Sequence, residues 1–362
     1  MVSDAVGQLS ASLHGTVLGQ YPWLEWFIRS VIDFLTGPLT GQRTRSYWPE
    51  LVAALVIAAL VFMIRDRLPG QRAGAFLRYC FPRPVFIHQS TLVDCKLTAA
   101  NHFVAPLLNI TWRLNSAMFT GVLVAGLTFL FGPPPHWFTW SASVMVLFTI
   151  LCALADDFGY YLFHLLAHRV PWLWAFHRVH HSAETLQVVA NVRVHPVELM
   201  LTPPFKSAGL SLVLAPAIYL GPGDAPLATI FGINLMVVFY GLIGAQLHHS
   251  HIWLSWGPVL EHILISPAQH QIHHSTAPRH WNKNMGGNFA LWDWMFGTLY
   301  VPRTREDLTF GLGGGRQPHP TLLAAYLEPF WSIMPARGHA ESLARRIFPS
   351  MFRGVADREL SR

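Results

Sequence analysis

The sequence has few charged residues. Asp, Glu, Lys and Arg together make up 12% of its 362 residues, whereas hydrophobic residues make up 52%. Soluble globular chains carry about 25% charged residues, so this composition argues against a soluble protein and predicts a membrane protein. The net charge of +6 comes from scattered Lys and Arg without a basic stripe. We therefore expect no nucleic-acid partner, and contact with a membrane surface is a better explanation of the positive net charge.

Cysteine is also scarce, and the common redox motifs are missing. Cys80, Cys95 and Cys152 have no CxxC spacing, so we expect neither disulfides nor a sulfur-ligated metal. The chain has no dinucleotide fingerprint, no ferredoxin cysteine set and no haem motif. The N-terminus lacks the basic region and short apolar run of a cleaved signal peptide, so we expect it to stay on the mature protein.

What the sequence has instead is apolar runs. The runs that suggest membrane helices cover 51–64, 118–131, 141–155, 210–220 and 227–247. The second and third are joined by "GPPPHW" and the last two by "GPGDAP", so they form two hairpins. Both hairpins are short against the roughly 20 residues of a full span, and some arms are expected to be re-entrant.

The charges beside these runs predict an orientation. The segment 65–96 is rich in Arg, whereas the two Pro/Gly turns carry only Asp224. The positive-inside rule then places 65–96 in the cytoplasm and the turns outside. We expect an all-α, multi-pass integral membrane protein with transmembrane or re-entrant hairpins and a His-rich metal domain on the cytoplasmic face.

The same pattern divides the chain into four parts. They are an N-terminal interfacial segment, transmembrane helices with a basic loop, a His-rich domain that includes the second hairpin, and a C-terminal cytoplasmic cap. Their boundaries are 1–48, 49–155, 156–302 and 303–362. In the first part, 21–36 carries Glu25, Arg29 and Asp33 four residues apart opposite an apolar face. This pattern predicts an interfacial helix, and an ordinary surface helix fits it as well.

Histidine is abundant and clustered. Fourteen of the 20 histidines lie between His164 and His280. "HLLAH" places His164 and His168 at i and i+4, on one face of a helix that continues from an apolar run. "HRVHH" and "HQIHH" repeat the spacing HxxHH, and the three imidazoles of each triplet are expected to converge on one point. The triplets are His177, His180 and His181, and His270, His273 and His274.

These eight histidines predict a metal centre. A lone HxxxH pair is more often an interfacial pair than a metal site, but eight imidazoles packed together need a partner for every ring nitrogen. Eight to ten ligands are too many for one ion and suit two ions with four or five each. Imidazole accepts Zn, Cu, Fe or Ni, so spacing alone does not choose iron over zinc.

Two functional classes follow from this pattern. One is a redox enzyme acting on a lipid, and the other is a His-rich metal transporter or zinc-binding membrane protein. A transporter would bury ionisable residues within its spans. Here the apolar runs are almost free of them and the histidines come after the runs, which favours the enzyme.

The histidine motifs resemble a known family. "HLLAH", "HRVHHS", "RVHPVE", "SPAQHQIHHS" and "NKNMGGNFALWDWMFGTLYVP" are together similar to the fatty acid hydroxylase/sterol desaturase superfamily of membrane non-haem di-iron enzymes. The bacterial sterol desaturase family branch of this superfamily, which also resembles alkylglycerol monooxygenase, is especially similar. The resemblance covers about 156–302. It implies hydroxylation of a C–H bond in a lipid-like substrate, such as a fatty acyl or sterol compound, with desaturation as the alternative.

The resemblance also implies cofactors, partners and site residues. It implies two Fe ions, with Zn as a substitute after purification, and an external electron donor of the ferredoxin or cytochrome b5 type. The implied ligands are His164, His168, His177, His180, His181, His195, His249, His270, His273 and His274. The carboxylates Asp157 and Glu198 are expected to orient imidazole N–H groups, while Asn284 and Asp293 match a motif in which packing is an equal explanation.

Three features depart from the family pattern. Leu165 stands where Arg often follows the first histidine, and His251 stands where Asn is usual, so His248 and His249 compete with it for one ligand position. His195 has an alternative role as the cap of a helix that begins with Pro196. No fused cytochrome b5 domain is found in the sequence, and the oligomeric state and the substrate are not predicted.

Overall fold

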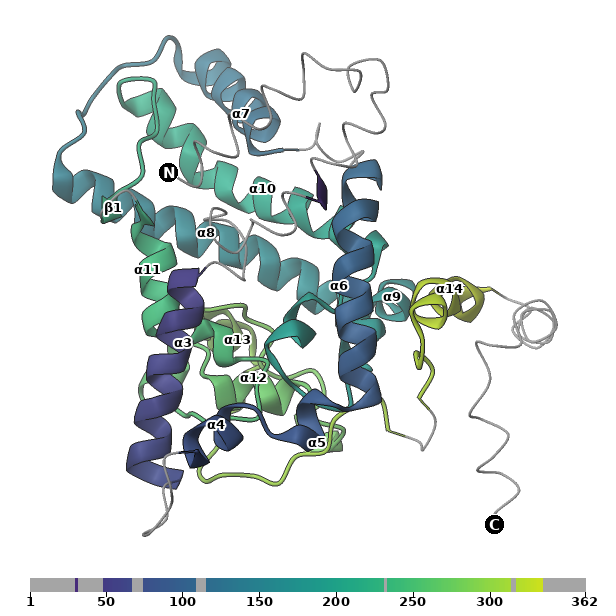
Figure 1. The fold of residues 1–362 in the computed structure, drawn as a ribbon. Helices are drawn as coiled ribbons and strands as arrows, with labels where there is room; N and C mark the ends of the chain where they lie inside the picture. The colour runs from purple at the N-terminus through teal and green to yellow at the C-terminus, as the bar shows by residue number, and fades with distance from the viewer. Residues whose placement is uncertain are drawn as a thin grey trace, which may run out of the picture.

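The computed structural model describes residues 30–31, 48–66, 74–108, 115–230, 233–313 and 317–334. The regular secondary structure within these ranges is helical apart from one small β-hairpin (Figure 1), so the all-α prediction is confirmed. Most of the expected interfacial helix at 21–36 and the residues from 335 onward lie outside the described ranges.

The principal helices follow one another along the chain with short connections. The first half contains α3 (Trp48–Val61), η2 (Phe62–Asp66), α4 (Ala75–Cys80), α5 (Arg83–Phe86), α6 (Gln89–Leu108), α7 (Ser116–Phe131) and α8 (Ala142–Arg169). The second half contains α9 (Pro171–His181), η4 (Val188–Val192), α10 (Pro196–Leu220), α11 (Leu235–Leu242), η5 (Ala245–Leu247), η6 (Leu260–His262), α12 (Pro267–His273), η7 (Pro278–His280), α13 (Leu291–Phe296) and α14 (Leu322–Ile333). The strands β1 (Thr229–Ile230) and β2 (Ile233–Asn234) pair antiparallel just before α11.

Two glycines let α8 and α10 pack closely. A Cβ on Gly159 of α8 would lie 2.4 Å from the Phe205 carbonyl oxygen, and one on Gly209 of α10 would lie 2.4 Å from the Ala155 carbonyl oxygen. Only glycine permits these backbone approaches, as in helix pairs that pack through small residues. The contact fixes the C-terminal half of α8, which carries His164 and His168, beside the middle of α10.

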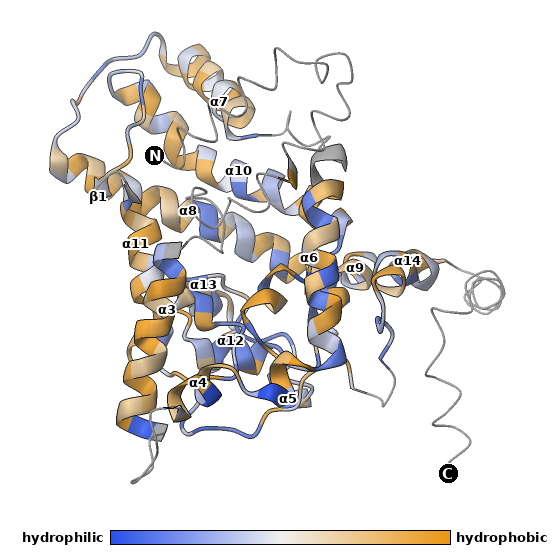
Figure 2. Cartoon of the chain, viewed as in Figure 1, coloured by the Kyte–Doolittle hydropathy of each residue, from blue (hydrophilic) through white to orange (hydrophobic). Residues whose placement is uncertain are grey.

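The apolar and polar parts of the molecule are separated. Figure 2 shows apolar residues along α3, α7 and α11, whereas hydrophilic residues gather around α12. Among the described residues, α8 is the one helix that is both long and apolar enough to cross a membrane, and α7 is apolar but shorter. The number of crossings and the cytoplasmic orientation therefore stay predictions.

The predicted runs agree with the helices in part. α7 and α8 match the first hairpin, and α8 continues past the apolar run as expected. The run 227–247 is not one helix, so this prediction was wrong. The Asn234 side chain accepts from the Met236 N–H and starts α11, which has only eight residues, and Gly244 ends the segment at φ +66°. At a rise of 1.5 Å per residue α11 is about 12 Å long, too short for a span.

Candidate metal centre

Five histidines from three helices form the first of two groups. Their ligand nitrogens all lie within 4.8 Å of one another. Group 1 consists of His164 and His168 from α8, His177 and His181 from α9, and His273 from α12. His168 is half-buried and the other four are buried.

Four buried histidines form the second group beside the first. Group 2 consists of His180 at the end of α9, His249 in the loop after η5, His270 in the middle of α12, and His274 directly after α12. The rings of His181 and His274, one from each group, lie with their centroids 4.6 Å apart. The two groups are therefore adjacent.

Each HxxHH triplet is divided between the two groups, which corrects the expectation that its three imidazoles converge. His177 and His181 belong to group 1 and His180 to group 2, whereas His270 and His274 belong to group 2 and His273 to group 1. The reason is helical geometry. With about 100° per residue, positions i and i+4 are about 40° apart, but consecutive residues diverge by about 100°. Each triplet thus contributes to both groups.

The local sequence shapes these helices. Pro171 begins α9, where a missing N–H costs nothing. α12 begins with a capping box, in which Ser266 accepts from the Gln269 N–H and the Gln269 side chain accepts from the Ser266 N–H. These caps set the start of each helix and therefore the direction of its histidines.

The ring nitrogens in each group are arranged for metal binding rather than for hydrogen bonding. The Nε2 of His177 lies 3.1 Å from the Nε2 atoms of His164, His168 and His181, yet a neutral imidazole has only one N–H to donate. The buried Nε2 of His273 has no hydrogen-bond partner among the described residues. Converging lone pairs of this kind fit a divalent metal ion.

The charge state of the rings agrees with this arrangement. Burial, reinforced by the neighbouring histidines, lowers the pKa of His181, His270 and His274 well below the usual value. Burial lowers the pKa of His273 to about 3. These imidazoles are therefore neutral at pH 7, the form that binds a metal.

Several ring Nδ1 atoms bind fixed acceptors, which leaves Nε2 as the lone-pair donor. The Nδ1 of His164 lies 2.7 Å from the Met285 carbonyl oxygen, and that of His273 lies 2.8 Å from the Lys283 carbonyl oxygen. The Nδ1 of His180 lies 3.2 Å from the Arg193 carbonyl oxygen. Outer contacts of this type fix the tautomer and the orientation of a ligand ring.

Glu198 has the place expected from the sequence. It lies in the first turn of α10, and its Oε1 is 2.9 Å from the Nδ1 of His177. Both side chains are buried. A carboxylate in this position accepts the Nδ1–H and makes the imidazole more basic.

Asp157 has a different role from the one expected. It does not contact an imidazole among the described residues; its carboxylate accepts from the backbone N–H groups of Asn288 (2.8 Å) and Phe289 (3.2 Å). Asp293 acts in the same way on Met285 (2.7 Å) and Gly286 (2.7 Å). The two carboxylates thus fix the loop whose carbonyl groups hold the histidines.

The conformation of this loop requires its particular residues. Asn282 and Asn284 have φ of +56° and +55°, a region that Asn tolerates better than most residues. A Cβ on Gly286 would lie 2.3 Å from the Phe289 carbonyl oxygen, and one on Gly287 would lie 2.8 Å from Asp157 Oδ1. Asn284 donates to the Gln269 carbonyl (3.0 Å) and accepts from a backbone N–H, so it links the loop to α12.

Three of the other candidate histidines lie outside both groups. His195 caps α10: its Nδ1 accepts from the Val197 N–H, and its Nε2 lies 3.0 Å from the Tyr326 carbonyl oxygen. This placement agrees with the helix-cap alternative and corrects the expectation that His195 is a ligand. The Nε2 atoms of His248 and His251 lie near backbone carbonyl oxygens. Among His248, His249 and His251, which competed for one ligand position, His249 is therefore the one that joins a group.

Sequence reasoning missed the backbone carbonyls of Lys283, Met285 and Arg193. A carbonyl contributes no residue type that a motif could reveal. The available signal was the "NKN" spacing, because two Asn residues around one Lys suggest left-handed backbone on both sides of it.

Comparison with known proteins relates part of the chain to one protein family. The sequence profile of the Fatty acid hydroxylase family matches residues 149–298, a segment that includes every histidine of both groups. No solved structure matches the chain.

Several characterised proteins are similar to the chain over part of their length. Ornithine lipid hydroxylase OlsE of Rhizobium tropici is 31% identical over 53% of this chain and 52% of its own length. Human alkylglycerol monooxygenase is 32% identical over 44% of this chain and 32% of its own length. A putative Delta(7)-sterol-C5(6)-desaturase 2 of Arabidopsis thaliana is 24% identical over 64% of this chain and 75% of its own length. The chain thus spans about half or less of the first two relatives. The segment 149–298, which carries both groups of histidines, is therefore similar to the Fatty acid hydroxylase family.

Proposed function

We propose that this protein is an O2-dependent non-haem di-iron oxidoreductase that hydroxylates a C–H bond of a lipid-like substrate. The observation that carries the proposal is the pair of adjacent histidine groups, with five and four imidazoles, that share both HxxHH triplets. Bound iron would supply the activation of O2, which imidazoles alone cannot perform. Zinc would fit the same nitrogens and can replace iron during purification.

The proposed ligands are the nine histidines of groups 1 and 2. His195 is left out because both of its ring nitrogens already have backbone partners. Glu198 keeps the proton of His177 at Nδ1, and the carbonyls of Lys283 and Met285 do the same for His273 and His164. Eight of the nine rings are buried, so the protein keeps bulk water away from the reacting atoms.

The proposed substrate is a long-chain lipid that stays in the bilayer. Its support is the apolar helix α8, which ends in the ligands His164 and His168, so a hydrocarbon beside α8 would have one end close to the site. The names of the relatives agree with a lipid substrate. Desaturation is the second candidate, since one relative is named as a sterol desaturase.

The proposed electron donor is a separate protein of the ferredoxin or cytochrome b5 type. Reduction of O2 needs an external reductant, and the chain has no sequence motif for a flavin, nicotinamide, haem or iron–sulfur group. We expect that the purified protein does not turn over with NAD(P)H alone. Turnover with NAD(P)H and no added carrier would contradict this part of the proposal.

The proposed location is a multi-pass membrane protein with the histidines on the cytoplasmic side. The turns at 132–136 and 221–226 lie at the same end of the molecule, because Trp140 Nε1 donates to Asp224 Oδ1 (2.6 Å) and His136 Nδ1 lies 2.6 Å from the Gly221 carbonyl oxygen. Single cysteines at Pro134 and Asp224 should be labelled from outside the cell. Labelling of both only from the cytoplasm would reverse the orientation.

The reaction can be tested with isotopic oxygen. A strain that expresses the protein is grown under ¹⁸O₂, and its lipids are compared with those of a strain that expresses His273→Ala. A lipid that carries ¹⁸O only with the wild-type protein supports hydroxylation, whereas an unlabelled alkene establishes desaturation. Identical lipids in the two strains, with and without oxygen, would contradict the oxygenase proposal.

A further inference from the structure

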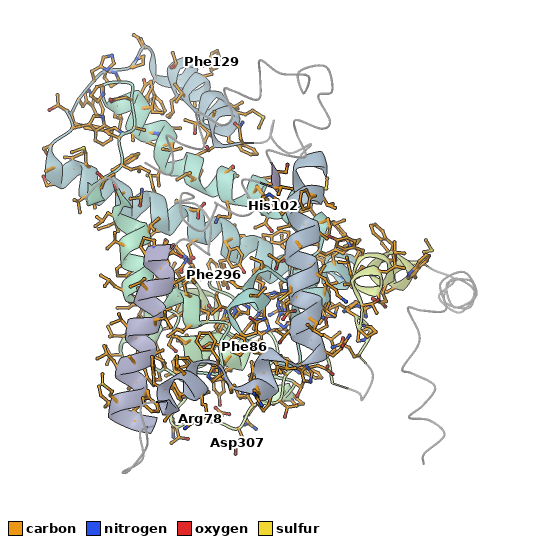
Figure 3. The ribbon with its side chains drawn as sticks, in the orientation of Figure 1. Arg78, Phe86, His102, Phe129, Phe296 and Asp307 are labelled. Atoms are coloured by element: carbon orange, nitrogen blue, oxygen red, sulfur yellow. The ribbon has the colours of Figure 1, made fainter. Side chains whose placement is uncertain are left out.

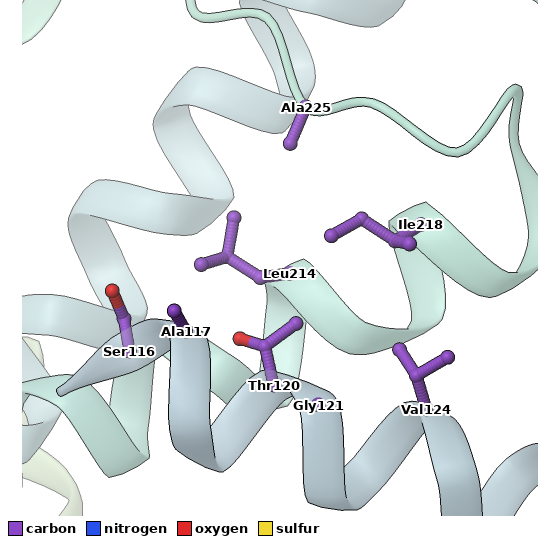
Figure 4. A pocket seen from close by; sticks show the side chains of 8 residues that line it. All are labelled: Ser116, Ala117, Thr120, Gly121, Val124, Leu214, Ile218 and Ala225. Carbon is purple, nitrogen blue, oxygen red and sulfur yellow. The ribbon is translucent and has the colours of Figure 1, made fainter. Parts of the chain in front are cut away.

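A cavity of about 470 Å³ lies between α7 and α10, at the end of the molecule away from the histidines. Figure 4 shows Ala117 and Val124 on α7 facing Leu214 and Ile218 on α10, with Ala225 of the following loop across the space. Its volume falls in the range of about 300–1,000 Å³ that is usual for small-molecule sites.

The lining offers a ligand almost no polar partner. Six of the eight lining residues carry no polar side-chain atom, and the other two are Ser116 and Thr120. The Thr120 hydroxyl donates to Ser211 Oγ (3.0 Å), and the Ser211 hydroxyl lies within hydrogen-bond distance of the Ser116 carbonyl oxygen (3.1 Å). The Thr120 hydroxyl is therefore already bonded within the wall, which leaves the Ser116 hydroxyl as the other polar side-chain group of the lining, so the space suits a hydrocarbon rather than water.

The outer surface beside the cavity indicates where that hydrocarbon comes from. On α7, Phe129 is 88% exposed, Phe131 72% and Val122 66%, and Phe129 extends outward from the helix (Figure 3). On α10, Leu212 is 60% exposed. Large apolar side chains exposed on both helices are expected where a protein faces lipid. The molecules that surround this cavity are then the alkyl chains of the bilayer.

The position along α10 separates this cavity from the substrate site. Glu198, which contacts the group 1 ligand His177, lies sixteen residues before Leu214 on the same helix. At 1.5 Å per residue this is about 24 Å along the helix. The cavity and the contact to the metal ligand therefore lie about four turns apart on α10.

We propose that the cavity binds one alkyl chain of a resident membrane lipid that is not the substrate. The bound chain fills the space between α7 and α10 and supports the helix that carries Glu198. The inference rests on the proposed membrane location but not on the proposed reaction, because it uses the cavity and the exposed apolar side chains beside it.

Two glycines of α7 provide a matched test. A Cβ on either Gly121 or Gly126 meets no atom within 4 Å, but only Gly121 lines the cavity. Gly121→Phe should fill the cavity, and Gly126→Phe adds the same side chain to the same helix outside it. The full chain is purified in detergent, stripped of lipid and titrated with dioleoyl phosphatidylcholine, while bound lipid is counted by native mass spectrometry and the Tm is recorded.

We expect that wild type and Gly126→Phe each bind one phosphatidylcholine molecule in the titration and that their Tm rises as it binds. Gly121→Phe should bind that lipid at least tenfold more weakly, and its Tm should rise little when phosphatidylcholine is added. If Gly121→Phe does not fold, Leu214→Trp compared with Leu212→Trp makes the same test on α10. Equal lipid binding by the filled and control variants would overturn the proposal. Displacement of the lipid by a substrate of the enzyme would also overturn it, because the occupant would then be the substrate chain.

Discussion

Removal of the Glu198 carboxylate tests how the protein holds its first metal ion. Glu198 accepts the Nδ1–H of His177 at 2.9 Å, and both side chains are buried. In Glu198→Ala this N–H loses its partner and the imidazole loses the contact that orients it. We expect metal binding at group 1 to weaken, while group 2, which receives no ligand from His177, keeps its affinity.

The magnitude follows from the contact that is lost. A hydrogen bond to a charged group contributes about 1.5–3 kcal/mol, and about 1.4 kcal/mol corresponds to a tenfold change in affinity. Glu198→Ala should therefore weaken binding of one ion by about 10–100-fold, the range usual for partners of metal-bound histidines. Glu198→Gln keeps an acceptor oxygen and loses only the charge, so its loss should be at the low end of that range.

A competitive titration with a chelator measures the effect. The purified full chain is loaded with Co²⁺, and the two dissociation constants are compared between wild type and variants. Glu306→Ala is the matched control, because Glu306 also contacts a buried imidazole, His280 Nε2 at 3.2 Å, but neither residue belongs to a histidine group. Wild-type affinity for both ions in Glu198→Ala would refute the role given to this carboxylate.

Two further predictions concern stability. In Gly286→Ala the new Cβ would lie 2.3 Å from the Phe289 carbonyl oxygen, so denaturant unfolding should show a loss of about 1–3 kcal/mol or more, whereas Gly126→Ala, with open space around it, should show none. Burial lowers the pKa of His319 to about 4, with a smaller contribution from the nearby cations of Arg193 and Arg178. The contact with Glu328 acts in the opposite direction but does not offset burial. The unfolded chain accepts this proton near pH 6.5, so the contribution of the neutral ring, up to about 3 kcal/mol, is complete above pH 6.5 and is lost as the pH falls toward 4. Thermal unfolding of His319→Gln should therefore depend less steeply on pH in this window, and identical slopes would contradict the prediction.

The histidines of the site could be predicted from the sequence because their spacing matches the helical repeat. His164 and His168 lie on one face of α8, and His177 and His181 on one face of α9, as i and i+4 residues must. The division of each triplet between two groups was not predicted. The 100° between consecutive residues separates the members of a triplet, but which histidines from other helices join each of them depends on how α8, α9 and α12 are placed around one another, and spacing within one helix does not give that placement.

The role of Asp157 could not be predicted for a related reason. Its position seven residues before His164 puts it two turns away on α8, so it looks like a partner for an imidazole. In the fold, the backbone N–H groups of Asn288 and Phe289 donate to the Asp157 carboxylate, so this carboxylate binds the loop instead of an imidazole. The length of α11 was misjudged because an apolar run gives the composition of a segment but not the points where Asn and Gly residues interrupt it.

The number of metal ions bound per chain is the most direct test of the central claim that two adjacent histidine groups form a two-metal site. Protein is purified anaerobically, and its metal content is measured together with that of His180→Ala and His273→Ala, which remove one ligand from group 2 and group 1 respectively. The expected result is two ions in the wild-type chain and a loss of metal in each variant. A single ion in the wild type, or full metal content in both variants, would contradict the account.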